Sequence, residues 1–462
     1  MGTSASEYWE QKAAYFRNSG PTFVLAWTVV GYLTGMTERR VLNIVHALVE
    51  DEPVVALHGP RSVGKSTLLR EFAAGRGVDV IDLDDPEVLD AAIANPALAV
   101  SGPAPVCIDE YQKAPDLLRA LKARLNREGA LSGTAVLTGS TRQDAVCATA
   151  EALTGRIHTL TIHPLSQGEI AGVHEDLLSV LMDDPDEAVA AYPTSTTMRD
   201  DYITRVCAGG FPLALRRSGA ARARWFDDYV LLSVERDAVE IARIRQRQVL
   251  RALLERLAGQ TAQVMNVTSA VRDIDADRKT IDTYVRLLED LFLVRILPAW
   301  GKTLRSKVTK LPKLHVVDSG VASRLLRCSE AKMATLDPTV QTEFGNLLET
   351  FVVGELAKQV SWLPEPVTVG HWRTNDDDEV DFIIEYDDGK VLAFEVKAHQ
   401  RVSRSDLKGC RKLRDTLGDR FVAGVALSTG TRSYTFEDRI HVMPVDRLWR
   451  PVRRRSARAD RC

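Results

Sequence analysis

The run GPRSVGKST has the clearest chemical pattern in this 462-residue chain. It matches G-x-x-x-x-G-K-[ST], in which glycines let backbone N–H groups surround phosphate oxygens. In that pattern the lysine contacts the terminal phosphates and the following hydroxyl binds Mg²⁺. The run therefore predicts a site for ATP and Mg²⁺, made by Gly59, Pro60, Arg61, Ser62, Val63, Gly64, Lys65, Ser66 and Thr67, with Ser66 as a metal ligand.

An acidic pair follows the next apolar run, which we interpret as a buried strand at 106–108. Asp109 is expected to complete the Mg²⁺ shell, and Glu110 to orient or deprotonate the attacking water. Acidic pairs at strand ends also occur without any catalytic role. The short spacing after the phosphate loop favours catalysis.

Two further residues are expected to act on the nucleotide. Ser140 lies at the polar end of the apolar run 135–139, where a side chain could sense the γ-phosphate. Arg156 precedes another apolar run and could reach the nucleotide of a neighbouring subunit as an arginine finger. A surface salt bridge is the alternative for Arg156. A finger that acts in trans requires a homo-oligomer.

A second polar group lies in DEVDFIIEYDDGKVLAFEVKA, residues 378–398. Asp381 lies on one apolar run, and Glu395 and Lys397 lie on the next. Residues two apart on a strand face the same side, so Glu395 and Lys397 should point the same way. Glu349 lies upstream on a predicted helix, 342–359. Carboxylate oxygens suit Mg²⁺, and a metal-bound water is a better nucleophile, so this order could make a hydrolytic metal site.

The elements that must position these residues follow from apolar periodicity. Residues 54–57 predict a buried strand that enters the phosphate loop, and an amphipathic helix follows the loop. Residues 166–236 are predicted to be mostly helical, with a flexible acidic insertion at 176–199. Residues 246–297 predict a helix, a short helix, a turn, a second helix and a strand, which is a winged-helix pattern.

Basic residues near this pattern could contact nucleic acid. Arg278, Lys279, Thr283 and Arg286 could face outward from the second helix, although neighbouring aspartates oppose phosphate and a purely structural role is the alternative. GKTLRSKVTKLPK, residues 301–313, has five basic residues and no acid. It could follow a nucleic-acid backbone, or it could be a lysine-protected edge hairpin.

Composition excludes several classes of protein. The chain is 45% hydrophobic and 27% charged with a net charge of −3, as in a globular protein of several domains without an overall field for nucleic acid. Its six cysteines are scattered, which argues against a zinc site or a disulfide framework and fits the cytoplasm. The apolar stretch 22–36 is shorter than the roughly 20 residues that span a bilayer, so no membrane contact is expected.

The motifs resemble those of AAA-type P-loop ATPases, with Walker A and Walker B motifs, a sensor-like strand and an arginine before a later strand. More narrowly, the chain resembles a bacterial and archaeal ATPase family whose members carry a C-terminal restriction-endonuclease-like domain of unknown function. The resemblance covers 37–449 and rests on VIDLDDP (80–86), CIDEYQKAP (107–115), LTGS (137–140), TGRI (154–157), GGFPLAL (209–215), and EVDFI with FEVK (379–383 and 394–397).

The C-terminal polar group also resembles the site of PD-(D/E)xK nucleases, especially junction resolvases, which carry a helix glutamate. The resemblance implies that Asp381 and Glu395 bind Mg²⁺ or Mn²⁺ with help from Glu349. It also implies that Lys397 positions the water and stabilises charge on the phosphate. A fold that has kept this site without cutting is the alternative.

The expected fold is α/β: an AAA-type P-loop ATPase domain, a helical lid, a winged-helix domain and a C-terminal α/β restriction-endonuclease-like domain. We expect a cytoplasmic homo-oligomer that hydrolyses ATP and acts on nucleic acid, in the first instance DNA. A DNA-dependent motor with an inactive nuclease domain, and a signalling ATPase with a protein partner, are the alternatives. The expected ranges are 1–36 (N-terminal extension, with Met36 an alternative start), 37–165 (ATPase core), 166–240 (lid), 241–300 (winged helix), 301–316 (basic linker), 317–449 (nuclease-like domain) and 450–462 (arginine-rich tail).

Overall fold

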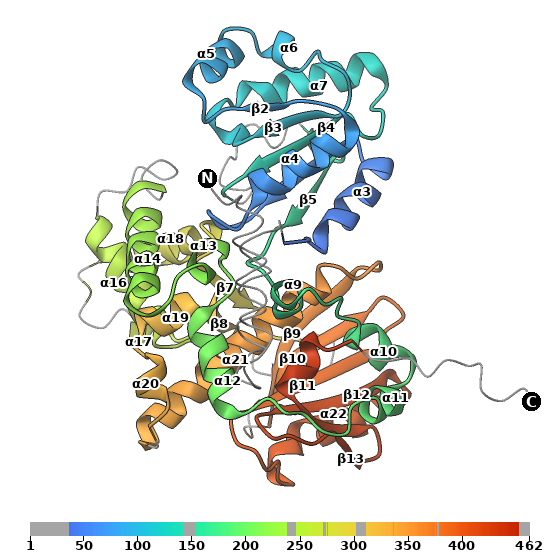
Figure 1. Cartoon of the computed structure of the whole chain (residues 1–462), viewed down its shortest axis with the longest axis vertical. Helices are drawn as coiled ribbons and strands as arrows, with labels where there is room; N and C mark the ends of the chain where they lie inside the picture. The colour runs from blue at the N-terminus through green and yellow to red at the C-terminus, as the bar shows by residue number, and fades with distance from the viewer. Residues whose placement is uncertain are drawn as a thin grey trace, which may run out of the picture.

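The computed structural model describes residues 37–141, 153–237, 246–270, 274, 276–301, 311–335, 337–374, 376 and 378–451. The predicted N-terminal extension and nearly all of the predicted tail lie outside these residues. Figure 1 shows an upper domain from the N-terminal part of the chain and a larger lower assembly from the rest. Within the described part of the chain, no helix combines the length and the apolar character that crossing a bilayer requires.

The upper domain is a parallel sheet covered by helices. Its elements are α3 (Val41–Asp51), β1 (Val54–His58), α4 (Lys65–Arg76), β2 (Val80–Asp82), α5 (Pro86–Ala94), α6 (Pro96–Ala99), β3 (Val106–Asp109), α7 (Asp116–Glu128), β4 (Ala135–Gly139) and β5 (Ile157–Thr161). The strands pair in the order β2-β3-β4-β1-β5. The central strands β1, β3 and β4 are buried throughout, as expected when both faces of a parallel sheet are covered.

The middle domain contains the three helices and the strand that the sequence predicts, with an additional strand between the first two helices. Its elements are α16 (Arg247–Ala258), β6 (Gln263–Val264), α17 (Val267–Ala270), α18 (Arg278–Asp290), β7 (Val294–Leu297) and β8 (Lys313–Val316). The strands form an antiparallel sheet in the order β6-β8-β7. β8 is therefore a central strand, and the predicted basic linker ends in regular structure. As predicted, α18 exposes or half-exposes its polar face, with Arg278, Lys279, Thr283 and Arg286 all exposed.

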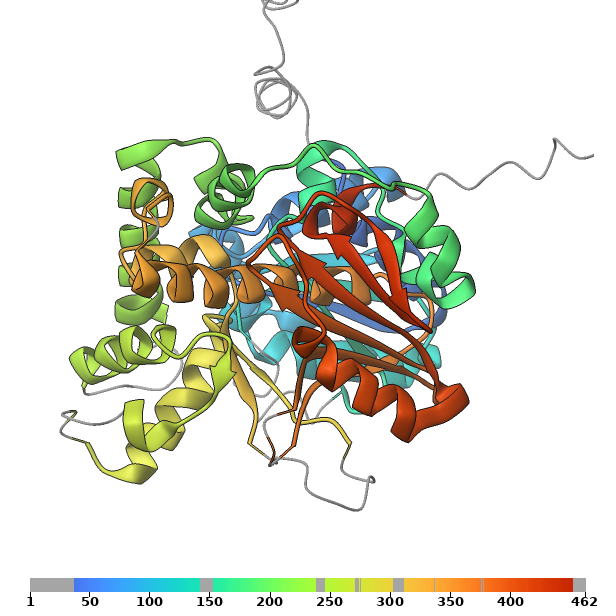
Figure 2. The same ribbon diagram turned by 90° about the horizontal axis from the view of Figure 1, so that it is seen from below.

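The C-terminal domain is a mixed sheet between two helices. Its elements are α19 (Ser319–Leu325), α20 (Glu330–Met333), α21 (Pro338–Val360), β9 (Val367–Arg373), β10 (Glu379–Tyr386), β11 (Val391–Lys397), α22 (Lys408–Leu417), β12 (Phe421–Ser428), β13 (Tyr434–Glu437) and β14 (Ile440–Pro444). The strand order is β13-β14-β12-β11-β10-β9. Figure 2 shows this sheet from below. Phe382 and Phe394 share one core with α21, whereas Ile383 and Ala393 share another with α22. The two helices thus cover opposite faces, as the alternation of strand side chains requires.

The predicted lid segment is helical but spreads over the lower assembly. It contains α9 (Gln167–Ala171), α10 (Leu177–Asp183), α11 (Pro185–Ala190), α12 (Arg199–Ala208), α13 (Pro212–Leu215) and α14 (Gly219–Leu232). α10 and α11 pack against β12 and β13, beside which Figure 1 shows them. The hydroxyls of Ser195 and Thr197 donate hydrogen bonds to Asp446 at 2.7 and 2.8 Å. The prediction of a flexible insertion at 176–199 is therefore wrong, because its apolar residues pack on the distant C-terminal sheet.

The GGFP motif makes a close junction between α12 and α19. Gly209 has a φ of +64°, and a Cβ atom there would lie 2.2 Å from Asp318 Oδ1. The backbone N–H of Gly210 donates a hydrogen bond to Asp318 Oδ2 at 2.7 Å. Backbone N–H groups of Gly320 and Val321 also donate to this buried carboxylate. The motif is thus explained by packing around one buried aspartate.

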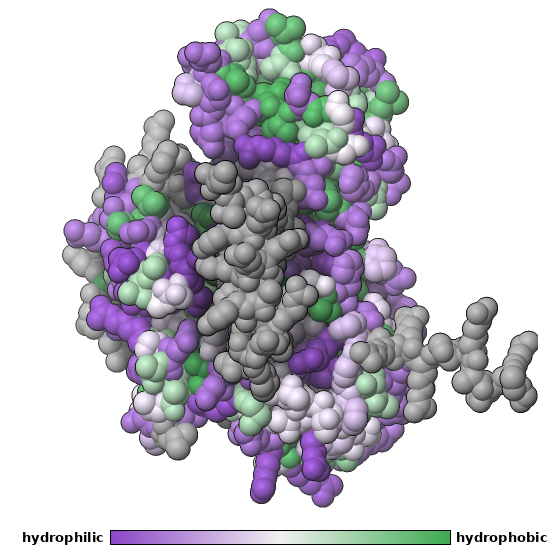
Figure 3. Space-filling model, in the orientation of Figure 1, coloured by the Kyte–Doolittle hydropathy of each residue, from purple (hydrophilic) through white to green (hydrophobic). Residues whose placement is uncertain are grey.

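Hydrophobic residues gather on the outer surface of the upper domain around α5 and α6 (Figure 3). Ile93 of α5 and Leu98 of α6 are 56% and 67% exposed. Burial of large apolar side chains lowers the free energy, so this surface could take part in contacts between molecules.

Candidate ATP site and carboxylate cluster

The phosphate loop joins β1 to α4 and is tightly packed. Gly64 adopts a left-handed conformation, with a φ of +95°. Gly59 lies against the chain that follows β5, because a Cβ atom there would be 2.2 Å from the carbonyl oxygen of Ile162. Lys65 is buried, and its Nζ donates hydrogen bonds to the carbonyl oxygens of Gly59 and Pro60 at 2.9 and 2.8 Å. The loop thus has a defined conformation, in which the ammonium of Lys65 is hydrogen-bonded to carbonyl oxygens of the loop itself.

Asp109 ends β3, and Thr138 faces it from β4. Both are buried, and Thr138 Oγ1 donates a hydrogen bond to Asp109 Oδ1. The backbone N–H of Glu110 donates in turn to Thr138 Oγ1 at 3.2 Å. One threonine therefore fixes both predicted acids at the carboxyl end of the sheet. The Asp109 carboxylate and the Ser66 hydroxyl, in the first turn of α4, offer the hard oxygen ligands that Mg²⁺ prefers, so these residues fit the metal.

Glu110 is connected to Ser140 through Gln112, a residue that the sequence analysis does not single out. Gln112 Nε2 donates hydrogen bonds to Glu110 Oε2 and, at 3.1 Å, to Ser140 Oγ. Glu110 is buried and has a φ of +55°. The amide thus links the predicted base to the predicted γ-phosphate sensor. Its signal in the sequence is its place two residues after Glu110. Thr67, in contrast, is exposed on α4.

His58 is a second residue that the sequence analysis misses. It is buried at the end of β1, and its Nε2 lies 3.0 Å from Tyr111 Oη. Burial, and then the charge of Lys65, lower the pKa of His58 to about 4. His58 is therefore neutral at pH 7, beside the lysine of the phosphate loop.

Arg39 joins the phosphate loop to the segment after β5. It is buried, and its Nη1 donates to the carbonyl oxygen of Val63 at 2.7 Å. Its Nη2 donates to the carbonyl oxygen of His163 at 2.8 Å, and its Nε donates to Glu169 Oε1 at 3.1 Å. A movement of the loop would therefore be transmitted to the start of the lower assembly.

Arg156 lies at the start of β5, whereas the phosphate loop follows the end of β1. The strands are parallel, with Val54 opposite Ile157. Arg156 and the phosphate loop therefore lie at opposite ends of this strand pair, which is five residues or roughly 16 Å long. Arg156 Nη1 donates to Asn126 Oδ1 at 2.5 Å. Arg156 is thus remote from the ATP site of its own subunit, and its action in trans stays a prediction.

A cavity of about 180 Å³ lies between the phosphate loop and α14. Trp225 and Tyr229 of α14 stack there, with ring centroids 5.3 Å apart and planes inclined by 13°. The lining residues are Arg61, Ser62, Trp225, Asp228, Tyr229, Leu232 and Ser233.

The structure brings together the four predicted residues of the C-terminal group. Glu349 comes from α21, Asp381 from β10, and Glu395 and Lys397 from β11. Lys397 Nζ donates to Glu395 Oε1 at 2.7 Å. Asp381 Oδ2 accepts a hydrogen bond from the backbone N–H of Val396 at 2.8 Å. The elements therefore follow the order that the sequence predicts.

Lys313 lies among these carboxylates and was not expected there. Its side chain is 1% exposed, and its Nζ donates to Glu349 Oε1 at 2.8 Å and to Asp381 Oδ1 at 2.7 Å. It also pairs with Glu379. Lys313 is the last of the five basic residues for which phosphate contacts were predicted. For this lysine the prediction is wrong, because burial removes it from any phosphate; the other four lie outside the described residues.

The charges of this cluster shift several pKa values. Burial disfavours the ammonium of Lys313, but Asp381, Glu349 and Glu379 together outweigh burial and raise its pKa well above the ordinary value. Burial and the charge of Asp381 raise the pKa of Glu349 to about 8. The same two causes raise the pKa of Glu395 well above its usual range. Crowding of the buried carboxylates thus opposes ionisation of Glu349 and Glu395, whereas the same carboxylates stabilise the charge of Lys313.

This geometry does not fit the predicted Mg²⁺ or Mn²⁺ site. Among the residues that the structure describes, no group of three or more aspartate, glutamate, histidine or cysteine side chains is arranged to hold a metal ion. Lys313 lies between Glu349 and Asp381, and Glu395 pairs with Lys397. The three predicted metal ligands thus contact ammonium groups instead.

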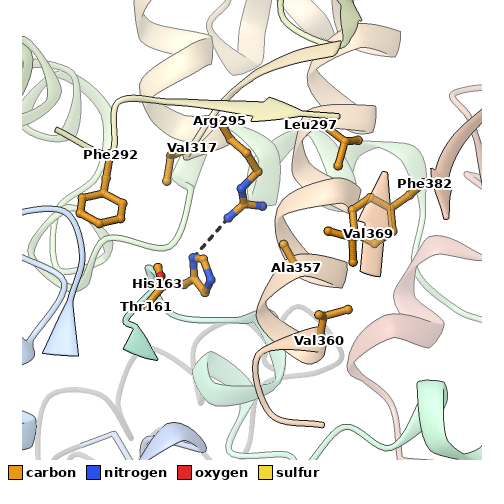
Figure 4. A pocket seen from close by; sticks show the side chains of 10 residues that line it. All are labelled: Thr161, His163, Phe292, Arg295, Leu297, Val317, Ala357, Val360, Val369 and Phe382. Atoms are coloured by element: carbon orange, nitrogen blue, oxygen red, sulfur yellow. Dashed lines mark hydrogen bonds between the residues drawn. The ribbon is translucent and has the colours of Figure 1, made fainter. Parts of the chain in front are cut away.

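A second cavity, of about 200 Å³, lies where the upper, middle and C-terminal domains meet (Figure 4). Arg295 of β7 points into it, and its Nη2 lies 3.3 Å from His163 Nδ1. His163 is the residue whose carbonyl oxygen contacts Arg39. The lining residues are Thr161, His163, Phe292, Arg295, Leu297, Val317, Ala357, Val360, Val369 and Phe382.

Comparison with protein families finds matches to three segments of the chain. Residues 51–171 match a family described as an AAA domain. Residues 199–332 match "Domain of unknown function (DUF8612)", and residues 344–448 match "Domain of unknown function (DUF4143)". The first match agrees with the geometry of the phosphate loop: the upper domain is an AAA-type P-loop ATPase domain, which binds and hydrolyses ATP.

Individual relatives add little about function. Two uncharacterized proteins, from Mycobacterium bovis and Mycobacterium tuberculosis, are each 27% identical over 400 residues, or 86% of this chain and 81% of the relative. A Walker-type ATPase of Pyrococcus abyssi has a TM-score of 0.38 at 14% identity and covers 63% of this chain and 96% of its own. AMPPCP-bound DnaA from Aquifex aeolicus has a TM-score of 0.25 at 12% identity and covers 55% of this chain and 89% of its own. Both TM-scores are too low to carry an argument.

Proposed function

We propose that this protein couples ATP hydrolysis at the phosphate loop to an action on nucleic acid. The observation that supports the hydrolytic site is a meeting of three elements. Lys65 follows β1, Asp109 ends β3 with Glu110 directly after it, and Ser140 follows β4, all at the carboxyl edge of adjacent parallel strands. Ligands of open parallel sheets bind at this edge.

Each residue has a distinct role in this proposal. Ser66 and Asp109 would hold Mg²⁺, which offsets phosphate charge when it is bound. Lys65 would exchange its two loop carbonyls for phosphate oxygens. Glu110 would accept a proton from the attacking water, and Gln112 would hold its carboxylate in position through the hydrogen bond described above.

The cavity beside α14 supports a place for the nucleoside. Trp225 and Tyr229 present aromatic surface next to Arg61 and Ser62 of the loop. A purine ring can stack on such a surface. Nucleotide binding would then bring α14 and the phosphate loop into contact with one ligand.

The partner that we propose is nucleic acid, in the first instance DNA. Exposed Arg278, Lys279 and Arg286 on α18 support this proposal, because cations on one helix can contact successive phosphates. Arg278 lies 3.5 Å from Asp282, in an exposed ion pair that phosphate can displace at little cost.

The working form that we propose is a homo-oligomer. Arg156 is too far from its own ATP site to act there, and an arginine in trans would need a neighbouring subunit. Exposed Ile93 and Leu98 on the upper domain offer apolar contact area for such an assembly.

A metal-dependent nuclease is a second candidate, favoured by the convergence of Glu349, Asp381, Glu395 and Lys397. The position of Lys313 opposes cleavage in the described conformation. We therefore propose that the C-terminal domain serves the ATPase without cutting while Lys313 is in place.

The experiment that tests the ATP site compares wild type with Glu110→Gln. We expect the variant to bind ATP with unchanged affinity and to hydrolyse it at least about a hundredfold more slowly, because it lacks the proton acceptor. Nucleotide binding is measured with a fluorescent analogue and turnover by phosphate release. Loss of binding would contradict the role of Glu110 as a base.

The partner is tested with the same preparations. Duplex and single-stranded DNA should raise the ATPase rate of wild type, and replacement of Arg278, Lys279 and Arg286 by alanine should weaken DNA binding about tenfold or more at low salt. Arg251→Ala, an exposed arginine on the neighbouring helix α16, is the matched control. If DNA neither binds nor alters turnover of wild type, a protein partner replaces nucleic acid in the proposal.

A further inference from the structure

Lys313 belongs to one domain and is bound by another. It begins β8, where Lys313 pairs with Val264 of β6 and with Leu297 of β7 in the middle sheet. Its side chain leaves this sheet and enters the carboxylates of α21 and β10. The position of the ammonium is therefore set by the middle domain, whereas its ligands belong to the C-terminal domain.

The three N–H donors of Lys313 face three carboxylates, those of Glu349, Glu379 and Asp381, and a fourth carboxylate, Glu395, lies in the same cluster. Glu395 is 5% exposed, and its Oε2 has no hydrogen-bond partner among the residues that the structure describes. A buried carboxylate oxygen without a partner is costly and needs an explanation. Three cations, Lys313, Lys397 and Arg373, pair with the four carboxylates of Glu349, Glu379, Asp381 and Glu395. The cluster thus has an excess of hard oxygen ligands over cations.

We propose that Lys313 is a built-in cation that takes the place of a divalent metal, so that Glu349, Asp381 and Glu395 form a latent metal site that Lys313 keeps closed. An ammonium and Mg²⁺ or Mn²⁺ compete for the same carboxylate oxygens, and only one cation can lie between Glu349 and Asp381. Removal of the ammonium leaves the carboxylates as ligands for a metal. A movement of β8 away from the C-terminal domain would also remove the ammonium from the carboxylates. The middle domain would therefore regulate metal binding at the C-terminal site.

This inference does not rest on ATP hydrolysis, and metal binding tests it without nucleotide. Lys313→Met removes the charge and retains a long side chain. We expect millimolar Mn²⁺ to raise the Tm of this variant by about 3 °C or more, and to leave the Tm of wild type unchanged. Electron paramagnetic resonance of Mn²⁺ should show one additional bound ion per chain in the variant.

Two further variants complete the experiment. Lys358→Met is the matched control: Lys358 is also buried on a carboxylate, with its Nζ 2.6 Å from Glu355 Oε1 and 3.0 Å from the carbonyl oxygen of Leu165, and it lies outside the contacts of Lys313. Its Tm should fall without any response to Mn²⁺. Lys313→Met combined with Glu395→Gln should lose the response, because it lacks one of the ligands.

Two outcomes overturn the proposal. Equal binding of Mn²⁺ by wild type and Lys313→Met would show that the lysine does not close the site. Absence of binding by the folded variant would show that no latent site exists. If Lys313→Met does not fold, the combination with Glu379→Gln removes one charge of each sign and retains Glu349, Asp381 and Glu395. Failure of this folded double variant to bind Mn²⁺ would also refute the proposal.

Discussion

At the scale of single residues, the ATP site is organised by neutral side chains around charged ones. Thr138 holds Asp109 and the backbone of Glu110, and Gln112 holds the carboxylate of Glu110. His58 adds a ring that burial keeps neutral beside Lys65. A positive charge on His58 would repel the same ammonium that must bind phosphate.

Stability should therefore depend on the titration of His58. The folded pKa is about 4, below the ordinary value of 6.5. Between these values the unfolded chain binds a proton that the folded chain does not, so the stability of wild type should fall as the pH falls from 6.5 to 4 and should not change through this group above pH 6.5. His58→Gln lacks this titration, and the stability that wild type loses to it should approach about 3 kcal/mol at pH 4.

Urea unfolding of wild type and His58→Gln across this pH range measures the difference. The variant retains an amide that can reach Tyr111, so its stability near pH 7 serves as the reference. Parallel pH profiles for the two proteins would show that His58 is not held neutral by the fold.

At the scale of elements, junctions between distant segments explain motifs that resemble functional signals. The GGFP motif is required because Asp318 lies against the backbone of Gly209 and Gly210. Lys313, in a run of basic residues, is the first residue of the central strand of the middle sheet. The first feature connects the lid segment to the C-terminal domain, and the second connects the middle domain to it.

Gly209→Ala should therefore destabilise the protein by at least about 2 kcal/mol, because it adds a methyl group 2.2 Å from a carboxylate oxygen at a φ of +64°. Gly102→Ala is the control, since a Cβ atom there meets nothing within 4 Å. Thermal unfolding of the two variants makes the comparison. Similar Tm values would mean that the junction can relax around a side chain.

At the scale of the whole molecule, the three domains meet at the cavity of Figure 4. Arg39 contacts the phosphate loop at Val63 and the carbonyl of His163, and the ring of His163 contacts Arg295 of the middle domain. This chain of contacts offers a physical route from nucleotide to β7, which pairs with the strand that carries Lys313.

Assembly can be tested through Arg156. If it acts in trans, Arg156→Ala should lose ATPase activity, and a mixture with Lys65→Ala should recover part of it. Each intact phosphate loop of the first variant then meets an intact arginine of the second. Arg119→Ala, an exposed arginine paired with Asp116 on α7, is the control and should turn over ATP like wild type. A mixture that stays inactive would argue against a finger in trans.

The sequence by itself determined the ATPase domain and the elements that carry the C-terminal carboxylates. Gly59, Gly64, Lys65, Asp109 and Glu110 are recognisable because phosphate binding depends on a local loop and on acids at the end of the next apolar strand. The elements that carry Glu349, Asp381 and Glu395 follow from apolar periodicity, which is also a local property.

Only the tertiary structure decided what these carboxylates contact. Lys313 lies 36 residues before Glu349 and 68 before Asp381, and its partner choice depends on how β8 packs between two domains. The same reason applies to Arg39, to His58 and to the contact of Gln112 with Ser140, which form when segments distant in the chain fold together. Apolar periodicity indicates which residues are buried, whereas tertiary packing determines which charged side chains come into contact. The chemistry of the C-terminal cluster depends on these tertiary contacts.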